Sequence, residues 1–366
     1  MKLVIDARYT RTDQLDGISR YGSNLIAAAS KLADVLMLIN DERQLQFLPA
    51  DVPWVKINSP LSPAELFVAR RINKLGADVV FCPMQTMGSL GRRYGLILTI
   101  HDLIYYRHPK PPGFLPLPVR LLWRAYHKAY WPQRLLLNRA DTVATISRTT
   151  RSLLQQTRLT RREVRIVSNA AQPLGPPRDP SAPVGKDLLY MGSYMAYKNV
   201  ETLVDAMALL PGYRLHLLSP IQAPRRDELA DRAADAAQLV FHNGISDDDY
   251  LRLLHEATVL VTLSRDEGYG LPLIEAMAAG TPVIASDIPI FREVSENVAL
   301  HVDPDDPEAF AAAVRELEDP ERRRRASAEG VLRAAEYDWD RSAAQLVSAA
   351  EEVLGRRSGG RMPAWK

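Results

Sequence analysis

The stretch TVLVTLSRDEGYGLPLIEAM (258–277) contains, in order, a run of apolar and β-branched residues, a turn with two glycines, and a helix-forming segment. Its first six residues have the composition of a buried strand. Gly270 suits the cap of the helix that follows, and Pro272 suits its first turn, where proline removes no helical hydrogen bond. The stretch therefore predicts one strand–turn–helix step of an α/β domain.

The same alternation of short apolar runs and helical patterns continues on both sides of this stretch. Parallel βα units produce this rhythm, and a proline-dense segment without apolar periodicity interrupts it at 169–186. The predicted strands are KLVID (2–6), VLMLI (35–39), DVVFC (78–82), LILTI (96–100) and TVATI (142–146) before that segment, and DLLYM (187–191), YRLHLL (213–218), QLVF (238–241), TVLVTL (258–263) and PVIAS (282–286) after it. The expected fold class is α/β, with two Rossmann-like, doubly wound parallel-sheet domains that face each other across a ligand cleft.

The predicted domain boundaries follow these changes in composition. Residues 1–168 are expected to form the first domain, 169–186 the linker and 187–338 the second domain. A last helix at 339–354 could pack back on the first domain, and the small, basic residues at 355–366 are expected to be disordered.

The composition of the 366 residues is that of a soluble globular protein, with 46% hydrophobic and 25% charged side chains. A formal net charge of +2 argues against nucleic acid as a partner. Cys82 is the single cysteine, which excludes an internal disulfide and suits a reducing compartment. Because the chain has neither a run of about 18 apolar residues nor a leader-like start, we expect a cytoplasmic protein.

Glu267 precedes the glycine turn and Glu275 lies inside the helix, an arrangement that suits a phosphate-containing ligand. We expect backbone N–H groups near residues 270–273 to point outward, where unpaired donors and the helix dipole bind phosphate. Carboxylates repel phosphate but accept hydrogen bonds from hydroxyl groups, so each glutamate could hold a sugar on one side of a diphosphate. One nucleoside diphosphate sugar would satisfy all of these groups. The alternative is a glycine-rich turn with two solvated glutamates.

The extended segment EGYGLPLIEAMAAGTPVIAS (267–286) resembles the donor-site signature of the family 4 retaining glycosyltransferases. Further similar segments occur in the family's order: TIHDL (99–103), VSNAA (167–171), YMGSYMAYKNVETLV (190–204) and FHNGISDDDYLRLL (241–254). The resemblance implies the GT-B fold, in which two Rossmann-like domains face each other, with the sugar nucleotide on the second domain and the acceptor mostly on the first.

The resemblance also implies roles in the second domain. Glu267 would contact the transferred sugar, Glu275 would hold the ribose, and Lys198 would offset the charge that grows on the leaving diphosphate. Relatives often carry an arginine either just after the glycine or just before the lysine of this loop, where this chain has Ser193 and Tyr197. The second cation could come from elsewhere, or the Ser193 hydroxyl and the loop N–H groups could contact the phosphates instead. Main-chain contacts to sugar and diphosphate are expected from Gly268, Tyr269, Gly270 and Leu271, and contacts to the nucleobase from Ile245 and Ser246.

In the first domain, the resemblance points to four residues. Gly17 would let the backbone approach the diphosphate, and Arg20 and Tyr21 could meet the acceptor. His101 would lie near the hydroxyls of the transferred sugar, although a core histidine bonded to the adjacent Asp102 is the alternative.

The activity that the resemblance implies is transfer of a hexose with retention, through a front-face reaction that needs neither a metal nor a cofactor. GDP-mannose is the first expected donor, ahead of UDP-sugars, and the acceptor would be a glycan or a lipid-linked molecule in cell-envelope polysaccharide or glycolipid synthesis. A sugar-nucleotide epimerase, a phosphorylase and a lectin-like relative are alternatives. A nicotinamide oxidoreductase is disfavoured because no strand is followed by Gly-x-Gly-x-x-Gly.

Two acidic runs, DDD (247–249) and DPDD (303–306), could suggest a metal site of the Asp-x-Asp type. We favour a structural interpretation, in which Ser246 and the aspartates of DDD cap and charge the start of the helix that contains DYLRLL. DPDDPEAF (303–310) would be a loop that enters the next helix.

The segment from Leu103 to Ala140 contains seven Lys or Arg and seven aromatic residues but no Asp or Glu. A helix within it would place Val119, Leu122, Trp123, Tyr126 and Tyr130 on one face, and Arg120, Arg124, His127 and Lys128 towards the other. Such a helix can lie on an anionic membrane, so Arg120, Arg124 and Lys128 are candidate membrane contacts at the inner face of the membrane. The alternative is a core-facing helix with a solvated basic side.

Overall fold

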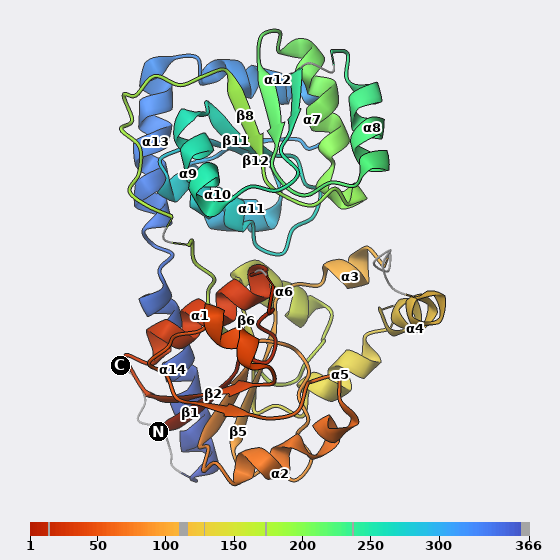
Figure 1. Cartoon of the computed structure of the whole chain (residues 1–366), viewed down its shortest axis with the longest axis vertical. Helices are drawn as coiled ribbons and strands as arrows, with labels where there is room; N and C mark the ends of the chain where they lie inside the picture. The colour runs from red at the N-terminus through yellow and green to blue at the C-terminus, as the bar shows by residue number, and fades with distance from the viewer. Residues whose placement is uncertain (14, 110–115, 128, 173, 236–237, 360–366) are drawn as a thin grey trace. The chain divides into compact units, whose positions relative to one another are not determined.

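The computed structural model describes residues 1–366 except 14, 110–115, 128, 173, 236–237 and 360–366 (Figure 1). Only the backbone is described at 122 and 125–127. The chain divides into two compact units: unit 1 comprises residues 1–170 and 338–366, and unit 2 comprises residues 171–337.

Unit 1 is built on a parallel sheet that has seven strands within the described residues, in the order β3-β2-β1-β4-β5-β6-β7. Helices α1 and α14 pack against each other on one face, and α2, α5 and α6 contribute apolar residues to the core on the other (Figure 1). The elements are β1 (Lys2–Asp6), α1 (Gly17–Ala29), β2 (Asp34–Ile39), η1 (Glu42–Phe47), β3 (Trp54–Lys56), η2 (Pro63–Phe67), α2 (Val68–Asn73), β4 (Val79–Cys82), β5 (Gly95–Ile100), α3 (Ile104–Arg107), α4 (Leu117–His127), α5 (Trp131–Leu137), β6 (Thr142–Thr145), α6 (Arg148–Gln156), β7 (Glu163–Ile166) and α14 (Trp339–Arg357).

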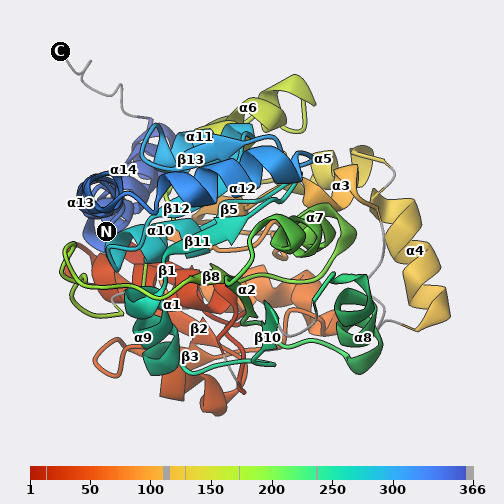
Figure 2. The ribbon, with the colours of Figure 1, turned by 90° about the horizontal axis from the view of Figure 1, so that it is seen from above.

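Unit 2 is built on a second parallel sheet, with six strands within the described residues in the order β10-β9-β8-β11-β12-β13. Helices α7, α8 and α12 bury their apolar faces on one side of it, and α9, α10 and α11 lie on the other (Figure 2). The elements are β8 (Asp187–Tyr190), η3 (Ala196–Lys198), α7 (Val200–Ala206), η4 (Met207–Leu209), β9 (Arg214–Leu217), α8 (Ala223–Arg232), β10 (Leu239–Phe241), α9 (Asp247–Glu256), β11 (Val259–Thr262), α10 (Leu271–Ala278), β12 (Val283–Ser286), α11 (Pro289–Ser295), β13 (Leu300–Val302), α12 (Pro307–Glu316) and α13 (Pro320–Ala334).

The predicted fold class, two Rossmann-like parallel-sheet domains, is confirmed by these two sheets. All ten predicted strands are present, but β3, β7 and β13 were not predicted. Each of the three lies at an edge of its sheet and has three or four residues, most of them partly or fully exposed. An edge strand is covered less completely than a central one, so it lacks the continuous apolar run by which the others were recognised.

The structure corrects the sequence analysis at two segments that were expected to be irregular. Helix α14 continues to Arg357, so the first residues of the predicted disordered tail are helical. In the predicted linker, Arg178 is buried, and its Nη1 donates to the carbonyl oxygen of Ala257 at 2.7 Å. Burial, with a contribution from Arg323, lowers the pKa of Arg178 to about 10. The segment around Arg178 is therefore fixed to unit 2.

The basic aromatic segment forms the three helices α3, α4 and α5. Tyr130 immediately precedes α5, so the expectation that it shares a face with the residues of α4 is wrong. On α4, the ring of Trp123 meets that of Tyr105 edge-on at 5.2 Å. Lys128, a predicted membrane contact, lies outside the described residues. Within the part of the chain that the structure describes, no helix is both long enough and apolar enough to cross a bilayer.

Candidate active site

In the sheet of unit 2, the order in which successive strands are added reverses between β8 and β11. The chain moves from β8 to β9 on one side and from β11 to β12 on the other, so the loops that leave β8 and β11 diverge at the carboxyl ends of adjacent strands. This topological switch point is where open parallel sheets bind ligands. Lys198 follows β8 and Glu267 follows β11, so both predicted residues lie at this edge of the sheet.

Lys198 and Glu267 form an ion pair at the switch point, with side chains that are 13% and 17% exposed. The ammonium of Lys198 also lies 5.5 Å from the centre of the Tyr197 ring. A hydrogen bond of 2.8 Å from the backbone N–H of Arg265 to the carbonyl oxygen of Tyr197 joins the two loops. The sequence predicted that Lys198 and Glu267 would each contact a donor, but not that they would contact each other.

Asn199 fixes the turn that presents Lys198, and sequence reasoning missed it. Its backbone is in the left-handed region, with φ of 54°, and the residue is 1% exposed. Its Nδ2 donates to the carbonyl oxygen of Pro304 at 2.6 Å, and its Oδ1 accepts from the hydroxyl of Thr202 at 2.9 Å. Asparagine is one of the few residues that enter this region readily, so the Asn directly after Lys198 was the available signal.

The loop after β8 is held by two further hydrogen bonds. The buried phenol of Tyr190 donates to the carbonyl oxygen of Ser193 at 2.7 Å, and the N–H of Gly192 donates to the hydroxyl of Ser219 at 3.0 Å. Burial, with a contribution from the charge of Glu267, raises the pKa of Tyr190, so this phenol stays protonated and keeps its bond. Ser193 itself is exposed, as a phosphate contact requires.

Helix α10 begins as the sequence predicts, with Gly270 as its cap and Pro272 in its first turn. The expected row of outward N–H groups is shorter than predicted. Pro272 has no N–H, and the N–H of Leu273 donates to the carbonyl oxygen of Gly270 at 3.0 Å. The donors that remain at this end of the helix are the N–H groups of Gly270 and Leu271.

Position 270 requires a glycine for two structural reasons, its backbone conformation and the space around it. Its φ is 95°, and a Cβ at this position would lie 2.8 Å from Cε1 of Phe291. A side chain here would therefore meet both backbone strain and a clash. Next to it, Tyr269 is 5% exposed and its ring meets that of Tyr337 edge-on, so only its backbone is available to a ligand.

Glu275 lies on α10 near α9, which follows the predicted nucleobase loop. Burial, and next the nearby Glu275 carboxylate, raise the pKa of the Tyr250 phenol on α9. Ser246 caps α9, because its hydroxyl oxygen accepts from the N–H of Asp249 at 3.1 Å. The Ser246 side chain is thus used in the cap, and the carbonyl oxygen of Ser246 accepts from the N–H of Tyr250 at 2.9 Å. The backbone of Ile245 and the N–H of Ser246 are left for contacts to a base.

The two acidic runs lie as the sequence analysis favoured, one at the start of a helix and the other in a loop that enters a helix. Asp247, Asp248 and Asp249 form the first turn of α9, and Asp306 caps α12 by accepting from the N–H of Ala309 at 2.8 Å. Within the described residues, no three His, Cys, Asp or Glu side chains gather as a metal site would require.

In unit 1, Gly17 is the first residue of α1 and is exposed. The cap of α1 is Asp16, whose carboxylate accepts from the N–H of Ser19 at 2.9 Å. A Cβ on Gly17 would meet no atom within 4 Å, so nothing within the described part of the fold requires a glycine there. Arg20 lies on the first turn of the same helix and is partly exposed.

The expected acceptor role of Tyr21 is wrong for its side chain. Tyr21 is fully buried, and its hydroxyl donates to the carbonyl oxygen of Val167 at 3.1 Å. Its ring packs edge-on against Trp339 on α14, at 6.0 Å. It is a core residue that helps to fix α1.

His101 follows β5 and is only partly exposed. Its Nε2 lies 2.7 Å from the carbonyl oxygen of Pro83, and because a carbonyl only accepts, Nε2 carries the proton. Burial lowers the pKa of His101, although the bond to Pro83 opposes this, so the ring is neutral at pH 7 and Nδ1 is an acceptor. The structural alternative placed Asp102 on this ring, but the hydrogen bond of the ring goes to the Pro83 carbonyl, and Oδ1 of Asp102 accepts from the N–H of Ile104 at 2.9 Å.

Comparisons with known proteins bear on both halves of the chain. The family model described as Glycosyltransferase Family 4 matches residues 16–173, and the one described as Glycosyl transferases group 1 matches residues 179–332. The chain is 31% identical to O-antigen chain mannosyltransferase B of Escherichia coli over 170 residues, which are 44% of each chain. It is 32% identical to phosphatidyl-myo-inositol mannosyltransferase of Mycobacterium tuberculosis over 185 residues, which are 47% of this chain and 48% of the relative.

These matches span about half the length of the curated relatives. Among solved structures, the Anabaena protein HepE in complex with UDP and glucose is similar over 96% of this chain and 99% of its own, with a TM-score of 0.72 and 16% identity. At that identity the similarity supports the fold alone, and it agrees with the two parallel sheets described above.

Proposed function

The chain belongs to the family 4 glycosyltransferases, since family models match both of its halves, and on that premise we propose that it transfers a hexose from a nucleoside diphosphate sugar with retention of configuration. GDP-mannose is the proposed donor, because curated relatives are named as mannosyltransferases. The proposed acceptor is a glycan or a lipid-linked molecule in the synthesis of cell-envelope polysaccharide or glycolipid. The observation that carries the proposal is the pairing of Lys198 with Glu267 at the switch point of unit 2.

The donor would be bound at its diphosphate and at the sugars on either side of it. The N–H groups of Gly270 and Leu271 and the exposed Ser193 would contact the phosphates, in line with the anion preference of a helix N-terminus. Glu275 would accept from the ribose hydroxyls, near the Ile245–Ser246 backbone that would meet the base. Glu267 would accept from a hydroxyl of the transferred sugar.

Lys198 would act on the leaving group. As the bond from sugar to diphosphate breaks, negative charge grows on the phosphate oxygens, and a fixed cation stabilises that state more than the ground state. The ion pair with Glu267 would hold the ammonium in place until the donor arrives, and the charge of Lys198 would become available to the phosphates once the donor separates the two groups. The proposed reaction takes place on one face of the sugar, with the leaving diphosphate accepting the acceptor's proton. It requires no metal ion, since Lys198 supplies the charge, and no cofactor.

A UDP-sugar is the alternative donor, and a solved structural neighbour was crystallised with UDP and glucose. Thermal-shift measurements with GDP-mannose, UDP-glucose and dTDP-glucose would separate these donors. A ligand at 100 times its dissociation constant stabilises the folded protein by about 2.7 kcal/mol, so we expect the matching donor to raise the melting temperature by roughly 5 °C or more. A flat response to all nucleotide sugars would contradict the proposal.

An epimerase or a phosphorylase would share the donor site. Incubation of the protein with donor and no acceptor would reveal an epimerase by a changed sugar, and a phosphorylase would require inorganic phosphate. We expect neither reaction, and transfer only when an acceptor is added.

Gly17 offers a test in unit 1 that is free of folding effects. Because a Cβ at Gly17 meets no atom within 4 Å, and alanine favours a helix more than glycine does, Gly17→Ala should not lower the melting temperature. If the backbone of Gly17 approaches the diphosphate, the added methyl displaces the donor, and displacements of about 1 Å can lower rates by about a hundredfold. We expect kcat/KM to fall by about tenfold or more.

Gly22→Ala is the matched control, because Gly22 lies on the same helix and also has no atom within 4 Å of an added Cβ. It should retain full activity. Equal activity in both variants would remove Gly17 from the site.

We also propose that the protein acts at the inner face of a membrane. Leu117, Val119 and Leu121 on α4 are exposed, on the helix that carries Arg120 and Arg124. Exposed apolar residues beside basic ones suit an anionic interface, and such a location would give access to a lipid-linked acceptor.

A further inference from the structure

Residues 103–162 concentrate positive charge in unit 1. They hold 12 of the 46 Lys and Arg of the chain but one of its 44 Asp and Glu, Asp141. That carboxylate is already paired with Arg92 at 2.7 Å. The rest of the chain has a net negative formal charge, although the total is +2. An anionic surface would therefore attract this part of the protein and repel the remainder, which orients the protein on the surface.

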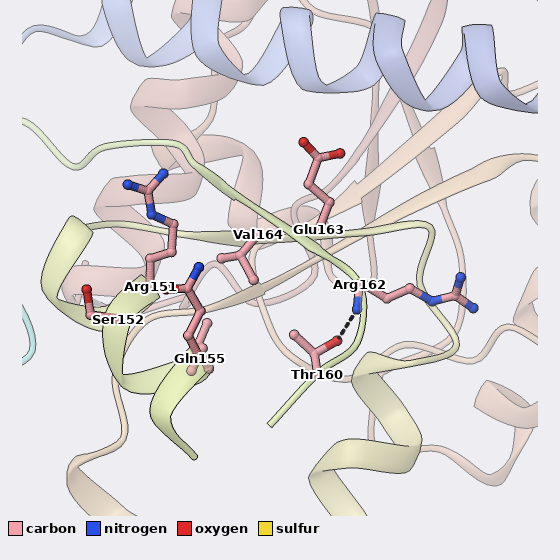
Figure 3. A pocket seen from close by; sticks show the side chains of 8 residues that line it. Arg151, Ser152, Gln155, Thr160, Arg162, Glu163 and Val164 are labelled. Atoms are coloured by element: carbon pink, nitrogen blue, oxygen red, sulfur yellow. Dashed lines mark hydrogen bonds between the residues drawn. The ribbon is translucent and has the colours of Figure 1, made fainter. Parts of the chain in front are cut away.

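Five of these basic residues line one groove of about 1280 Å3, between α5, the end of α6 and the turn that precedes β7. We call this the arginine groove, and its basic residues, all exposed, are Arg134, Arg139, Arg158, Arg161 and Arg162. A smaller hollow of about 350 Å3 shares Gln155, Thr160 and Arg162 with it and adds Arg151 (Figure 3). In Figure 3, Arg151 and Gln155 project from α6, and Thr160 and Arg162 come from the segment before β7.

Within the described residues, no carboxylate pairs with any of the five arginines of the groove. Exposed arginines of unit 2 differ, since Arg226 pairs with Asp227 at 2.9 Å, Arg252 with Glu256 at 3.2 Å and Arg292 with Asp287 at 2.6 Å. Glu163 lines the smaller hollow, but its carboxylate is paired with Arg165 at 2.9 Å and with Arg356. Five guanidinium groups around one groove repel each other unless an anion lies between them, and guanidinium matches phosphate in both charge and geometry.

Two of the five side chains are held in place by the backbone. Nε and Nη2 of Arg134 donate to the carbonyl oxygens of Arg158 and Thr157 at 3.1 and 2.8 Å. Nε and Nη2 of Arg162 donate to the carbonyl oxygen of Asn138 at 3.0 and 2.7 Å. The side chains of Arg139, Arg158 and Arg161 make no hydrogen bond within the described residues. The groove thus combines two fixed cations with three that can adjust to a ligand.

Exposed apolar residues beside the groove indicate that the phosphate groups it binds belong to a membrane lipid. Trp131 is 63% exposed and Leu135, which lines the groove, is 58% exposed. The two are four residues apart on α5, so they share one face of that helix. Tryptophan and leucine beside cations are the side chains that enter a bilayer interface. A soluble phosphate would make no use of this apolar pair, and Leu135 offers a nucleic acid no stacking surface.

We propose that the arginine groove binds the phosphate groups of anionic phospholipids, while Trp131 and Leu135 enter the bilayer interface. This inference deepens the membrane part of the proposed function and rests on it, but it does not rest on the donor or on the transfer reaction. It places the membrane contact on α5, the end of α6 and the turn before β7, beyond the residues of α4.

The test is binding to vesicles of phosphatidylcholine with and without phosphatidylglycerol, measured by co-flotation of the whole protein. The variant R139Q/R158Q/R161Q removes only side chains that hold no part of the fold. The matched control, R226Q/R252Q/R292Q, removes the same charge from unit 2. Each basic residue near an anionic surface contributes about fivefold in affinity, so we expect the groove variant to bind phosphatidylglycerol vesicles about a hundredfold more weakly and the control to bind like wild type.

The apolar contact is tested separately with W131S/L135S, which changes no charge and should also weaken binding. Equal affinity of the groove variant and the control would overturn the proposal, as would unchanged binding of W131S/L135S. Complete displacement by millimolar inorganic pyrophosphate, or equally tight arginine-dependent binding to double-stranded DNA, would assign the groove to another ligand and overturn it too.

The outcomes separate this inference from the function on which it rests. Wild-type protein that ignores phosphatidylglycerol vesicles would end both membrane proposals and leave the donor site untouched. The groove variant should keep the thermal shift with the nucleotide sugar, because no residue of the groove belongs to the proposed donor site.

Discussion

Lys198→Ala is expected to lower turnover by about a hundredfold or more at saturating donor, a typical size for the loss of one electrostatic contact to a transition state. Lys198 supplies the fixed positive charge that the leaving diphosphate would meet. Within the described residues no other cation is paired with Glu267, so none at this position would replace that charge. Steady-state kinetics with the donor identified by thermal shift would measure the effect. The fall should appear in kcat, because the charge grows only as the bond breaks.

Arg225→Ala is the matched control for this prediction. Arg225 pairs with Glu201 in the same unit, and the two side chains are 20% and 26% exposed, close to the exposure of the Lys198–Glu267 pair. Arg225 also pairs with Glu228 at 2.8 Å, so the variant removes one cation of comparable burial that is not paired with Glu267. We expect a small change in melting temperature and no change in kcat. Turnover near that of wild type in a folded Lys198→Ala protein would refute the assignment.

Glu267→Ala is expected to lower turnover by a similar factor, about a hundredfold or more, because the transferred sugar loses its hydroxyl acceptor and Lys198 loses the group that positions it. The two residues act as one unit in this structure, so the double variant should be little worse than either single variant. Glu267→Gln keeps an acceptor oxygen without the charge, and its rate separates the two contributions.

An additive double variant would contradict the coupling of Glu267 with Lys198, but not a role of Glu267 in the reaction. Additivity would mean that Lys198 and Glu267 stabilise the transition state independently, although they form an ion pair. A folded Glu267→Ala protein with wild-type kcat would exclude the residue from catalysis altogether.

The sequence was informative wherever local residues decide the structure. Gly270 and Pro272 lie at the start of α10 as expected, since a left-handed cap and a first-turn proline are local requirements. Central strands such as β1 and β11 were found because burial on both faces makes them continuously apolar. The edge strands β3, β7 and β13 lack that covering and were missed, whereas the edge strand β10 was predicted.

The features that the sequence did not predict depend on contacts between distant residues. The Lys198–Glu267 pair requires β8 and β11 to be neighbours, and no local pattern specifies this. Tyr21 was expected to meet an acceptor, but helix α14, more than 300 residues later in the chain, contributes Trp339 to the core around it. The arginine groove joins α5 to the end of α6, whereas composition alone drew attention only to residues 103–140.

The most direct test of the central claim is a crystal structure with the matching nucleotide sugar. We predict that the diphosphate lies within hydrogen-bond distance of the N–H groups of Gly270 and Leu271 and of Nζ of Lys198, with the ribose at Glu275 and the hexose at Glu267. A diphosphate bound elsewhere, with Lys198 still paired to Glu267 and the start of α10 untouched, would contradict the account.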